Sequence, residues 1–359
     1  MRGWAAALLL CACEAGDSGD SSSGSGDTFG GAETAGSGVA NESDHGADDD
    51  EVGTSGARLG STGPDASSDD AGGETGDRVP CPTEPMFDIA FAEHTDIDPN
   101  LLSLDVRPAP GDGLAPAVVF VHGGGWMIGD KSGIETGAFA LDFFADEGVT
   151  LVTTNYRLIN DEGSPNATWS DQPADVSAAL AWVSGHADEL CIDRDRIILI
   201  GHSAGAHIAA LVASDRAYLG AHDLDVSMLK SVVPLDVNAY DIPWAIENAA
   251  EHGLPSSSMS LQEVFTMDPE QHVAASPISH LDASIDHPPF LVVWAPVFQG
   301  VEQTLSEAAS ERFADALLAV GAEAEVLGSL EDDHSSLASQ LGRRGHPPTE
   351  AIRALLQEG

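Results

Sequence analysis

Apolar and polar positions follow a regular alternation in the C-terminal three quarters of the chain. Short apolar runs are followed by longer stretches in which apolar residues recur every three or four positions. The short runs predict β-strands, and the longer stretches predict amphipathic helices. We expect strands at 101–106, 116–121, 149–156, 196–200, 230–235, 290–294 and 323–328. We expect helices at 135–146, 171–185, 204–214, 306–320 and 348–357. This alternation is typical of an α/β fold in which helices cover both faces of a mostly parallel sheet.

One segment, 238–289, interrupts the alternation. Its aromatic residues are scattered rather than periodic, and it carries Pro243, Pro255, Pro269 and Pro277 among its prolines. A long irregular segment inside a compact domain is usually functional. We therefore expect a small cap-like excursion from the sheet, in which substrate specificity would be located.

Residues 14–79 lack any such pattern. They contain 16 acidic residues against two arginines and almost no large apolar side chains, so they predict a disordered Gly/Ser/Asp tether. Residues 80–359 form the expected folded domain and hold 43 acidic residues against 11 lysines and arginines. Such an acidic surface repels phosphate, which argues against nucleic acid and anionic membranes as partners.

The first thirteen residues, "MRGWAAALLLCAC", contain one positive charge followed by a short apolar stretch. This pattern predicts a signal peptide. The stretch "LCAC" resembles a bacterial lipobox, so we expect lipidation of Cys13 and an exported, lipid-anchored protein of the cell envelope, at the outer membrane or cell surface. A plain secreted protein is the alternative. Export would permit a disulfide between Cys81 and Cys191, although two cysteines alone do not decide it.

The chemistry is indicated by "RIILIGHSAGAHIAALVA", residues 196–213. A strand pattern runs into Gly-His-Ser-Ala-Gly, and a helix pattern of small residues follows. This is the context in which Gly-x-Ser-x-Gly forms a nucleophile elbow, with Ser203 at its apex. Gly201 and Gly205 are needed because the turn crowds the strand against the helix. We therefore predict Ser203 as the nucleophile of an acyl-transfer reaction.

A glycine-rich loop supplies the expected oxyanion hole. The strand at 116–121 ends in "HGGGW", residues 122–126. Glycines allow bare backbone N–H groups to approach a carbonyl oxygen on which negative charge develops. We select the N–H groups of Gly124, Gly125 and Ala204 as donors, and we expect His122 to brace the loop.

In order along the chain, HGGGW, "TTNYRL", GHSAG, "SPISH" and "DDHSSL" resemble the esterases of the hormone-sensitive-lipase, feruloyl-esterase-like and kynurenine-formamidase-like groups. This resemblance covers about residues 86–357 and implies the α/β-hydrolase fold. It implies a serine carboxylesterase that acts on short-chain or carbohydrate-linked esters, with a small-molecule or glycan ester as substrate and without a cofactor. An arylformamidase or peptidase, and a catalytically inactive binding module, are the alternatives. The oligomeric state is not indicated.

The base follows from the chain order Ser–acid–His of this fold. His334 lies in a polar loop after the last expected strand, and we predict it as the base. His202 belongs to the elbow and is expected to point elsewhere, whereas His207 is expected to pack inside the domain.

The sequence around the expected acid departs from the pattern of related esterases. Related esterases read His-Gly-x-x-Asp after the strand "PPFLVVW", whereas this chain reads "WAPVFQGVEQTLSEAAS". Alignment backwards from the following helix selects Glu302, and Asp236 at the end of the preceding strand is the alternative. Asp332 and Asp333 stand too close to His334 in the sequence to be chosen. No spacing of histidine, cysteine and carboxylate residues predicts a metal site.

Overall fold

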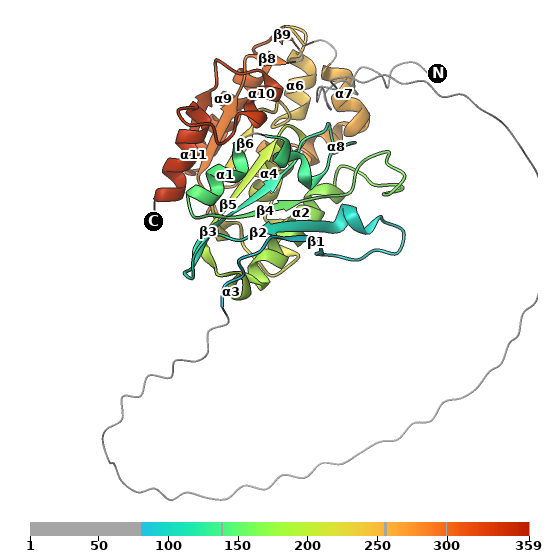
Figure 1. The fold of residues 1–359 in the computed structure, drawn as a ribbon. Coiled ribbons are helices and arrows are strands. Elements are labelled where there is room, and N and C mark those ends of the chain that lie inside the picture. The colour runs from blue at the N-terminus through green and yellow to red at the C-terminus, as the bar shows by residue number, and fades with distance from the viewer. Residues whose placement is uncertain (1–79, 138, 255–256, 299, 359) are drawn as a thin grey trace, which may run out of the picture. The chain divides into compact units, whose positions relative to one another are not determined.

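The computed structural model describes residues 80–358 except 138, 255, 256 and 299. The predicted signal peptide, Cys13 and the tether lie outside the described residues. In the described part, an eight-stranded sheet has the order β1–β2–β4–β3–β5–β6–β7–β10 (Figure 1). Its strands are β1 (Met86–Ala90), β2 (Ser103–Arg107), β3 (Ala115–Val121), β4 (Thr150–Thr154), β5 (Ile192–His202), β6 (Leu229–Leu235), β7 (Phe290–Trp294) and β10 (Ala324–Gly328).

The strands from β4 to β10 pair in parallel, whereas β1–β2 and β2–β4 pair antiparallel. The sheet is therefore mostly parallel, as predicted. The helices are α1 (Ala140–Asp146), α2 (Asp171–Gly185), α3 (Ala187–Leu190), α4 (Ala204–Ser214), α5 (Arg216–Gly220), α6 (Ile242–Asn248), α7 (Ser257–Val264), α8 (Pro269–Ala274), α9 (Leu305–Ala319), α10 (His334–Ser339) and α11 (Pro347–Gln357). Short 3₁₀ helices are η2 (Pro99–Leu102), η3 (Lys131–Thr136), η4 (Val226–Met228) and η5 (Pro277–His280).

Each face of the sheet has its own apolar core because successive strand side chains point to opposite faces. In β3, Val118 and Phe120 belong to one core, whereas Val119 and Val121 belong to the other. Helices α1 and α11 cover the first face, and α2, α4 and α9 cover the second (Figure 1). A continuous apolar strand such as β3 is thus explained by burial on both faces.

The excursion predicted for 238–289 contains α6, α7, α8 and η5, between β6 and β7. Figure 1 shows α6 and α7 grouped beside each other at one end of the domain. After β7 the chain forms a two-stranded hairpin that the sequence does not predict, β8 (Val297–Phe298) and β9 (Val301–Glu302). These additions lie at the carboxyl ends of the parallel strands, where ligands bind in open α/β sheets.

A disulfide links Cys81 to Cys191 across 110 residues of sequence. It joins the start of the described domain to the residue that precedes β5. Within the part of the chain that the structure describes, no helix is both long and apolar enough to cross a bilayer.

Candidate functional site

Ser203 occupies a strained turn between β5 and α4. Its backbone adopts φ 56° and ψ −120°, a conformation that residues other than glycine rarely adopt. A β-carbon on Gly201 would lie 2.1 Å from the carbonyl oxygen of Gly205, and one on Gly205 would lie 2.2 Å from that of Val121. The structure therefore confirms the predicted elbow and the reason for its two glycines.

His334 reaches Ser203 from a separate part of the chain, as predicted. It is the first residue of α10, and its Nε2 lies 2.9 Å from the Ser203 Oγ. Its side chain is only 12% exposed. The spacing is that of a hydrogen bond through which a serine proton can pass to imidazole.

The acid that contacts His334 is Asp236, not Glu302. Asp236 follows β6, and its Oδ2 lies 2.6 Å from the Nδ1 of His334. Glu302 is exposed at the end of β9, so our preferred acid is wrong and the alternative is correct in its geometry. The register argument fails because the residues between β7 and α9 form the β8–β9 hairpin.

Asp236 is held in the ionised form that this contact requires. Burial raises the pKa of its carboxyl group, but hydrogen bonds from His334, Ser306 and the Ala295 N–H outweigh burial and bring the pKa below its usual value. An ionised carboxylate only accepts hydrogen bonds, so Nδ1 of His334 carries the proton and Nε2 is free to accept one from Ser203. This is the tautomer that a general base needs.

His202 contacts His334 rather than the Ser203 hydroxyl, and the sequence analysis did not predict this contact. Its Nε2 lies 2.8 Å from the backbone oxygen of His334, and the two rings are 4.8 Å apart. Desolvation, together with a smaller contribution from repulsion by His334, lowers the pKa of His202 to about 4. His202 therefore stays neutral near pH 7 and donates a hydrogen bond that fixes the backbone of the base.

The glycine loop lies directly against the nucleophile. A β-carbon on Gly123 would lie 3.0 Å from the Ser203 Cβ, and one on Gly124 would lie 1.8 Å from the Ile128 oxygen. Gly124 and Gly125 have positive φ values of 124° and 59°. The sequence analysis did not select Gly123, although its position at the start of the glycine run was the available signal.

Ala204, the third predicted donor, begins α4. Backbone N–H groups in the first turn of a helix have no acceptor within that helix. The Ala204 N–H follows the nucleophile directly, and the positive end of α4 lies beside it. The backbone here can therefore stabilise an anion next to Ser203.

The loop is braced from behind by His122 and Tyr156. Their rings stack at 4.4 Å, and the Tyr156 hydroxyl donates to the His122 carbonyl at 2.9 Å. Nδ1 of His122 lies 2.7 Å from the Gly123 oxygen, and desolvation lowers the His122 pKa. His122 thus braces the loop, as predicted.

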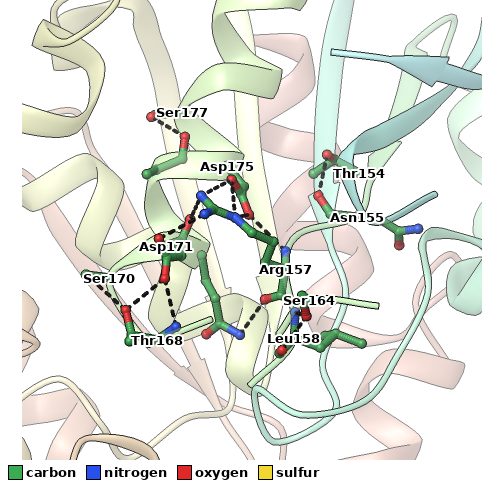
Figure 2. Close-up of polar contacts among 12 residues, drawn as sticks. Thr154, Asn155, Arg157, Leu158, Ser164, Thr168, Ser170, Asp171, Asp175 and Ser177 are labelled. Carbon is green, nitrogen blue, oxygen red and sulfur yellow. Dashed lines mark hydrogen bonds and ion pairs between the residues drawn. The ribbon is translucent and has the colours of Figure 1, made fainter. Parts of the chain in front are cut away.

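The "NYRL" motif explains a second brace, which Figure 2 shows in part. Arg157 binds Asp175 through Nε and Nη2 and Asp171 through Nη1, at 2.6–3.1 Å, so the start of α2 is fixed beside the loop. Gln172 in that first turn donates to the Trp126 carbonyl at 2.7 Å. The ion pairs therefore support the glycine loop indirectly.

Trp126 and His207 close the other side of the loop. The Trp126 indole donates to Nδ1 of His207 at 3.2 Å, and Nε2 of His207 lies 2.8 Å from the Ala275 oxygen. Burial lowers the pKa of His207 to about 4. His207 is thus a packed, neutral side chain, as predicted.

Asp332 supports the loop that carries His334. It accepts hydrogen bonds from Ser329, Ser336 and Nε2 of His346, the last at 2.7 Å. Burial raises its pKa, but these bonds bring the pKa below the usual value. Asp333 caps α10 through the N–H groups of Ser335 and Ser336. Neither carboxylate replaces Asp236, as the sequence analysis expects.

Among the described residues, no group of three or more histidine, cysteine or carboxylate side chains is arranged to hold a metal ion. The site consists instead of Ser203, His334 and Asp236 beside the glycine loop. Hydroxyl, imidazole and carboxylate form one continuous chain of hydrogen bonds. Such a chain can activate the hydroxyl as a nucleophile.

Comparison with known proteins gives the same picture. The probable carboxylic ester hydrolase LipM of Mycobacterium tuberculosis is 32% identical over 185 residues, which are 50% of this chain and 41% of LipM. The isoprenylcysteine alpha-carbonyl methylesterase ICME of Arabidopsis thaliana is 30% identical over 66% of this chain and 54% of its own length. The chain thus spans about half the length of these curated relatives.

Solved structures show the same fold. Esterase B from Lactobacillus rhamnosis has a TM-score of 0.56 and 17% sequence identity, over 76% of this chain and 84% of its own. The BD-FAE family model matches residues 104–313, more than half of the chain, including Ser203 and Asp236. The chain therefore belongs to the BD-FAE family and has the α/β-hydrolase fold of the esterases to which it is similar.

Proposed function

We propose that the protein is a serine carboxylesterase with Ser203 as nucleophile, His334 as base and Asp236 as acid. The observation that carries this proposal is the continuous contact from Ser203 Oγ to His334 at 2.9 Å and from His334 to Asp236 at 2.6 Å. The similarity to LipM and ICME, which are both named as ester hydrolases, supports it.

The reaction follows from the geometry. The Ser203 Oγ attacks the ester carbonyl carbon while Nε2 of His334 takes its proton. Negative charge then develops on the carbonyl oxygen, next to the Ala204 N–H and the glycine loop, where each donor lowers the barrier by about 3–4 kcal/mol. His334 returns the proton to the leaving alcohol, which leaves an acyl group on Ser203. Water activated by His334 then releases the acid and restores the serine.

Two features explain why His334 can change its charge during this cycle. Asp236 is ionised and buried against Nδ1, so it stabilises the imidazolium that forms. His202 stays neutral, so it adds no positive charge beside the base. A charged His202 would oppose protonation of His334 because the rings are only 4.8 Å apart.

The test is labelling of Ser203 by a fluorophosphonate together with hydrolysis of p-nitrophenyl esters. We expect one label on Ser203 in the wild type and neither label nor turnover in Ser203→Ala, with unchanged thermal unfolding. Ester turnover in Ser203→Ala within about tenfold of the wild type would exclude Ser203 as the nucleophile, because removal of such a nucleophile costs far more. Formylkynurenine in the same panel distinguishes amide from ester hydrolysis.

We also propose esters of short-chain acids as substrates. The glycine loop, Trp126 and His207 form a tightly packed region close to Ser203, which supports a small acyl group. A series of p-nitrophenyl esters from acetate to decanoate tests this point. Activity that rises through the longest chains would contradict it.

For the N-terminus, we propose export and lipidation of Cys13 on the basis of the LCAC sequence. Mass spectrometry of the mature N-terminus tests it. A lipidated Cys13 at the first position is the expected result, and an unmodified terminus beyond Cys13 would indicate a secreted protein.

A further inference from the structure

The β8–β9 hairpin occupies the place after β7 where the sequence analysis expected the acid. Two hydrogen bonds join the ends of the hairpin. The Gln303 backbone N–H donates to the Pro296 oxygen at 2.9 Å, and the Gln303 side-chain amide donates to the Ala295 oxygen at 2.9 Å. A parallel bridge joins Val297 to Asp333, the residue before the base. The hairpin is therefore attached directly to the loop that carries His334.

The hairpin is also attached to the segment 238–289. The Thr304 N–H donates to the His252 oxygen at 3.3 Å, and the His252 ring lies 2.7 Å from the Thr304 hydroxyl. A β-carbon on Gly253 would lie 3.2 Å from the Glu302 oxygen. The hairpin thus contacts both the segment 238–289 and the loop that precedes His334.

This arrangement places the Phe298 ring on His334. The two ring centroids are 4.8 Å apart, with 63° between their planes, in an edge-to-face contact. Phe298 is half-buried and packs against the apolar cluster of Ala249, Leu254 and Leu305. Its ring therefore contacts the segment that follows α6, the start of α9 and His334.

The chemistry determines which part of an ester lies there. His334 gives its proton to the leaving alcohol, so the alcohol must lie on the His334 side of Ser203, whereas the carbonyl oxygen faces the glycine loop and Ala204. Two rings contact the His334 ring. His202 does so from within the elbow, where the His202 backbone oxygen lies close to Gly123. Phe298 of the hairpin does so from outside the elbow.

The surroundings of Phe298 are apolar as well. Val301, which pairs with Phe298 in the hairpin, is 48% exposed. An exposed apolar side chain paired with a half-buried aromatic ring favours an apolar ligand.

We propose that Phe298 is a specificity-determining residue that borders the leaving alcohol and makes the enzyme prefer esters of aromatic or apolar alcohols. This inference rests on the proposed function, because it uses the direction in which His334 returns its proton. Phe298 takes no part in proton transfer. It provides a flat apolar surface for the alcohol.

The test compares two esters with the same acid and with alcohols of similar acidity, methyl butyrate and benzyl butyrate. We expect the wild type to prefer the benzyl ester in kcat/KM. In Phe298→Ala that preference should fall about tenfold, while turnover of the methyl ester stays close to that of the wild type. Phe298→Leu keeps an apolar side chain in the hairpin and should give an intermediate preference.

Leu318→Ala is the matched control, since Leu318 is 54% exposed on α9 and should leave the preference unchanged. A second readout is the pH profile of kcat with the methyl ester, which Phe298→Ala should not shift. An equal loss on both esters, or a shifted pH profile, would mean that Phe298 acts on His334 alone and would overturn the proposal. An unchanged preference would also overturn it.

The two proposals can fail separately. A wild type that hydrolyses methyl butyrate but shows no preference for the benzyl ester contradicts the role of Phe298 and leaves the esterase intact. A wild type that hydrolyses neither ester, and whose Ser203 is not labelled by a fluorophosphonate, contradicts the esterase and this inference with it.

Discussion

Replacement of Asp236 by asparagine tests how the base is oriented. Oδ1 of Asp236 accepts from the Ala295 N–H at 3.1 Å, and Oδ2 lies 2.6 Å from His334. In Asp236→Asn the amide oxygen will keep the Ala295 contact, because an N–H group there would face another donor. The amide NH₂ then faces Nδ1 of His334 and forces that nitrogen to accept.

The expected magnitude follows from this exchange of donor and acceptor. With Nδ1 as acceptor, Nε2 of His334 carries the proton and cannot take one from Ser203. We expect kcat to fall by up to about ten-thousandfold, as for a triad aspartate exchanged for asparagine. That factor corresponds to about 5 kcal/mol of lost transition-state stabilisation.

The assay is initial-rate hydrolysis of p-nitrophenyl butyrate, with thermal unfolding as a check on the fold. Glu302→Gln is the matched control, because Glu302 is an exposed carboxylate on the neighbouring β9. Its kcat should equal that of the wild type. A large loss in Glu302→Gln, or a loss of less than about tenfold in Asp236→Asn, would refute the assignment of the acid.

Three further outcomes follow from the contacts around the site. His202→Ala removes the hydrogen bond to the His334 carbonyl, which is worth about 1.5 kcal/mol, and should lower kcat by about tenfold or more. His202→Gln should restore part of the lost kcat, and unchanged kcat in both variants would contradict the positioning role of His202. The pKa of buried His207 is about 4 in the fold and higher when unfolded, so the unfolded chain binds more protons in between, and stability should fall as the pH drops from about 6.5 to about 4. Denaturant unfolding should show a weaker pH dependence in His207→Gln than in the wild type, and identical slopes would contradict the burial argument. Arg157→Met leaves Asp175 buried without its partner and should lower the free energy of unfolding by about 3–5 kcal/mol in the same assay, whereas the exposed control Arg194→Met should change it little.

Ser203, Gly201, Gly205 and the glycine loop were predictable because their roles depend on local backbone geometry. A strand, a turn and a helix that are adjacent in sequence have few ways to meet, and the glycines mark the close approaches. The main strands were predictable for a similar reason. Burial on both faces leaves continuous apolar runs that are easily seen in the sequence.

The acid was harder to predict because its identity depends on a segment without periodicity. The residues after β7 could be aligned backwards to Glu302, but they fold into a hairpin too short to show a strand pattern. Asp236 was a valid alternative because β6 and β7 are neighbours, so their carboxyl ends lie together. Sequence spacing does not reveal which of two neighbouring strand ends reaches the histidine.

The contact of His202 with His334 was missed for another reason. Side-chain direction in the elbow depends on the positive φ of Ser203, which a strand pattern does not indicate. The segment 238–289 was recognised as an excursion, but its helices α6, α7 and α8 were not predicted because each has only six to eight residues. In short elements, tertiary packing outweighs local preference.

The central claim is that Ser203 carries the acyl group during turnover. The most direct measurement is to mix the enzyme with p-nitrophenyl butyrate, quench with acid during the first turnovers, and identify modified peptides by mass spectrometry. The account predicts a butyryl group on Ser203 in the wild type and none in Ser203→Ala. Hydrolysis by the wild type with no acyl group on Ser203, or with the acyl group on another residue, would contradict it.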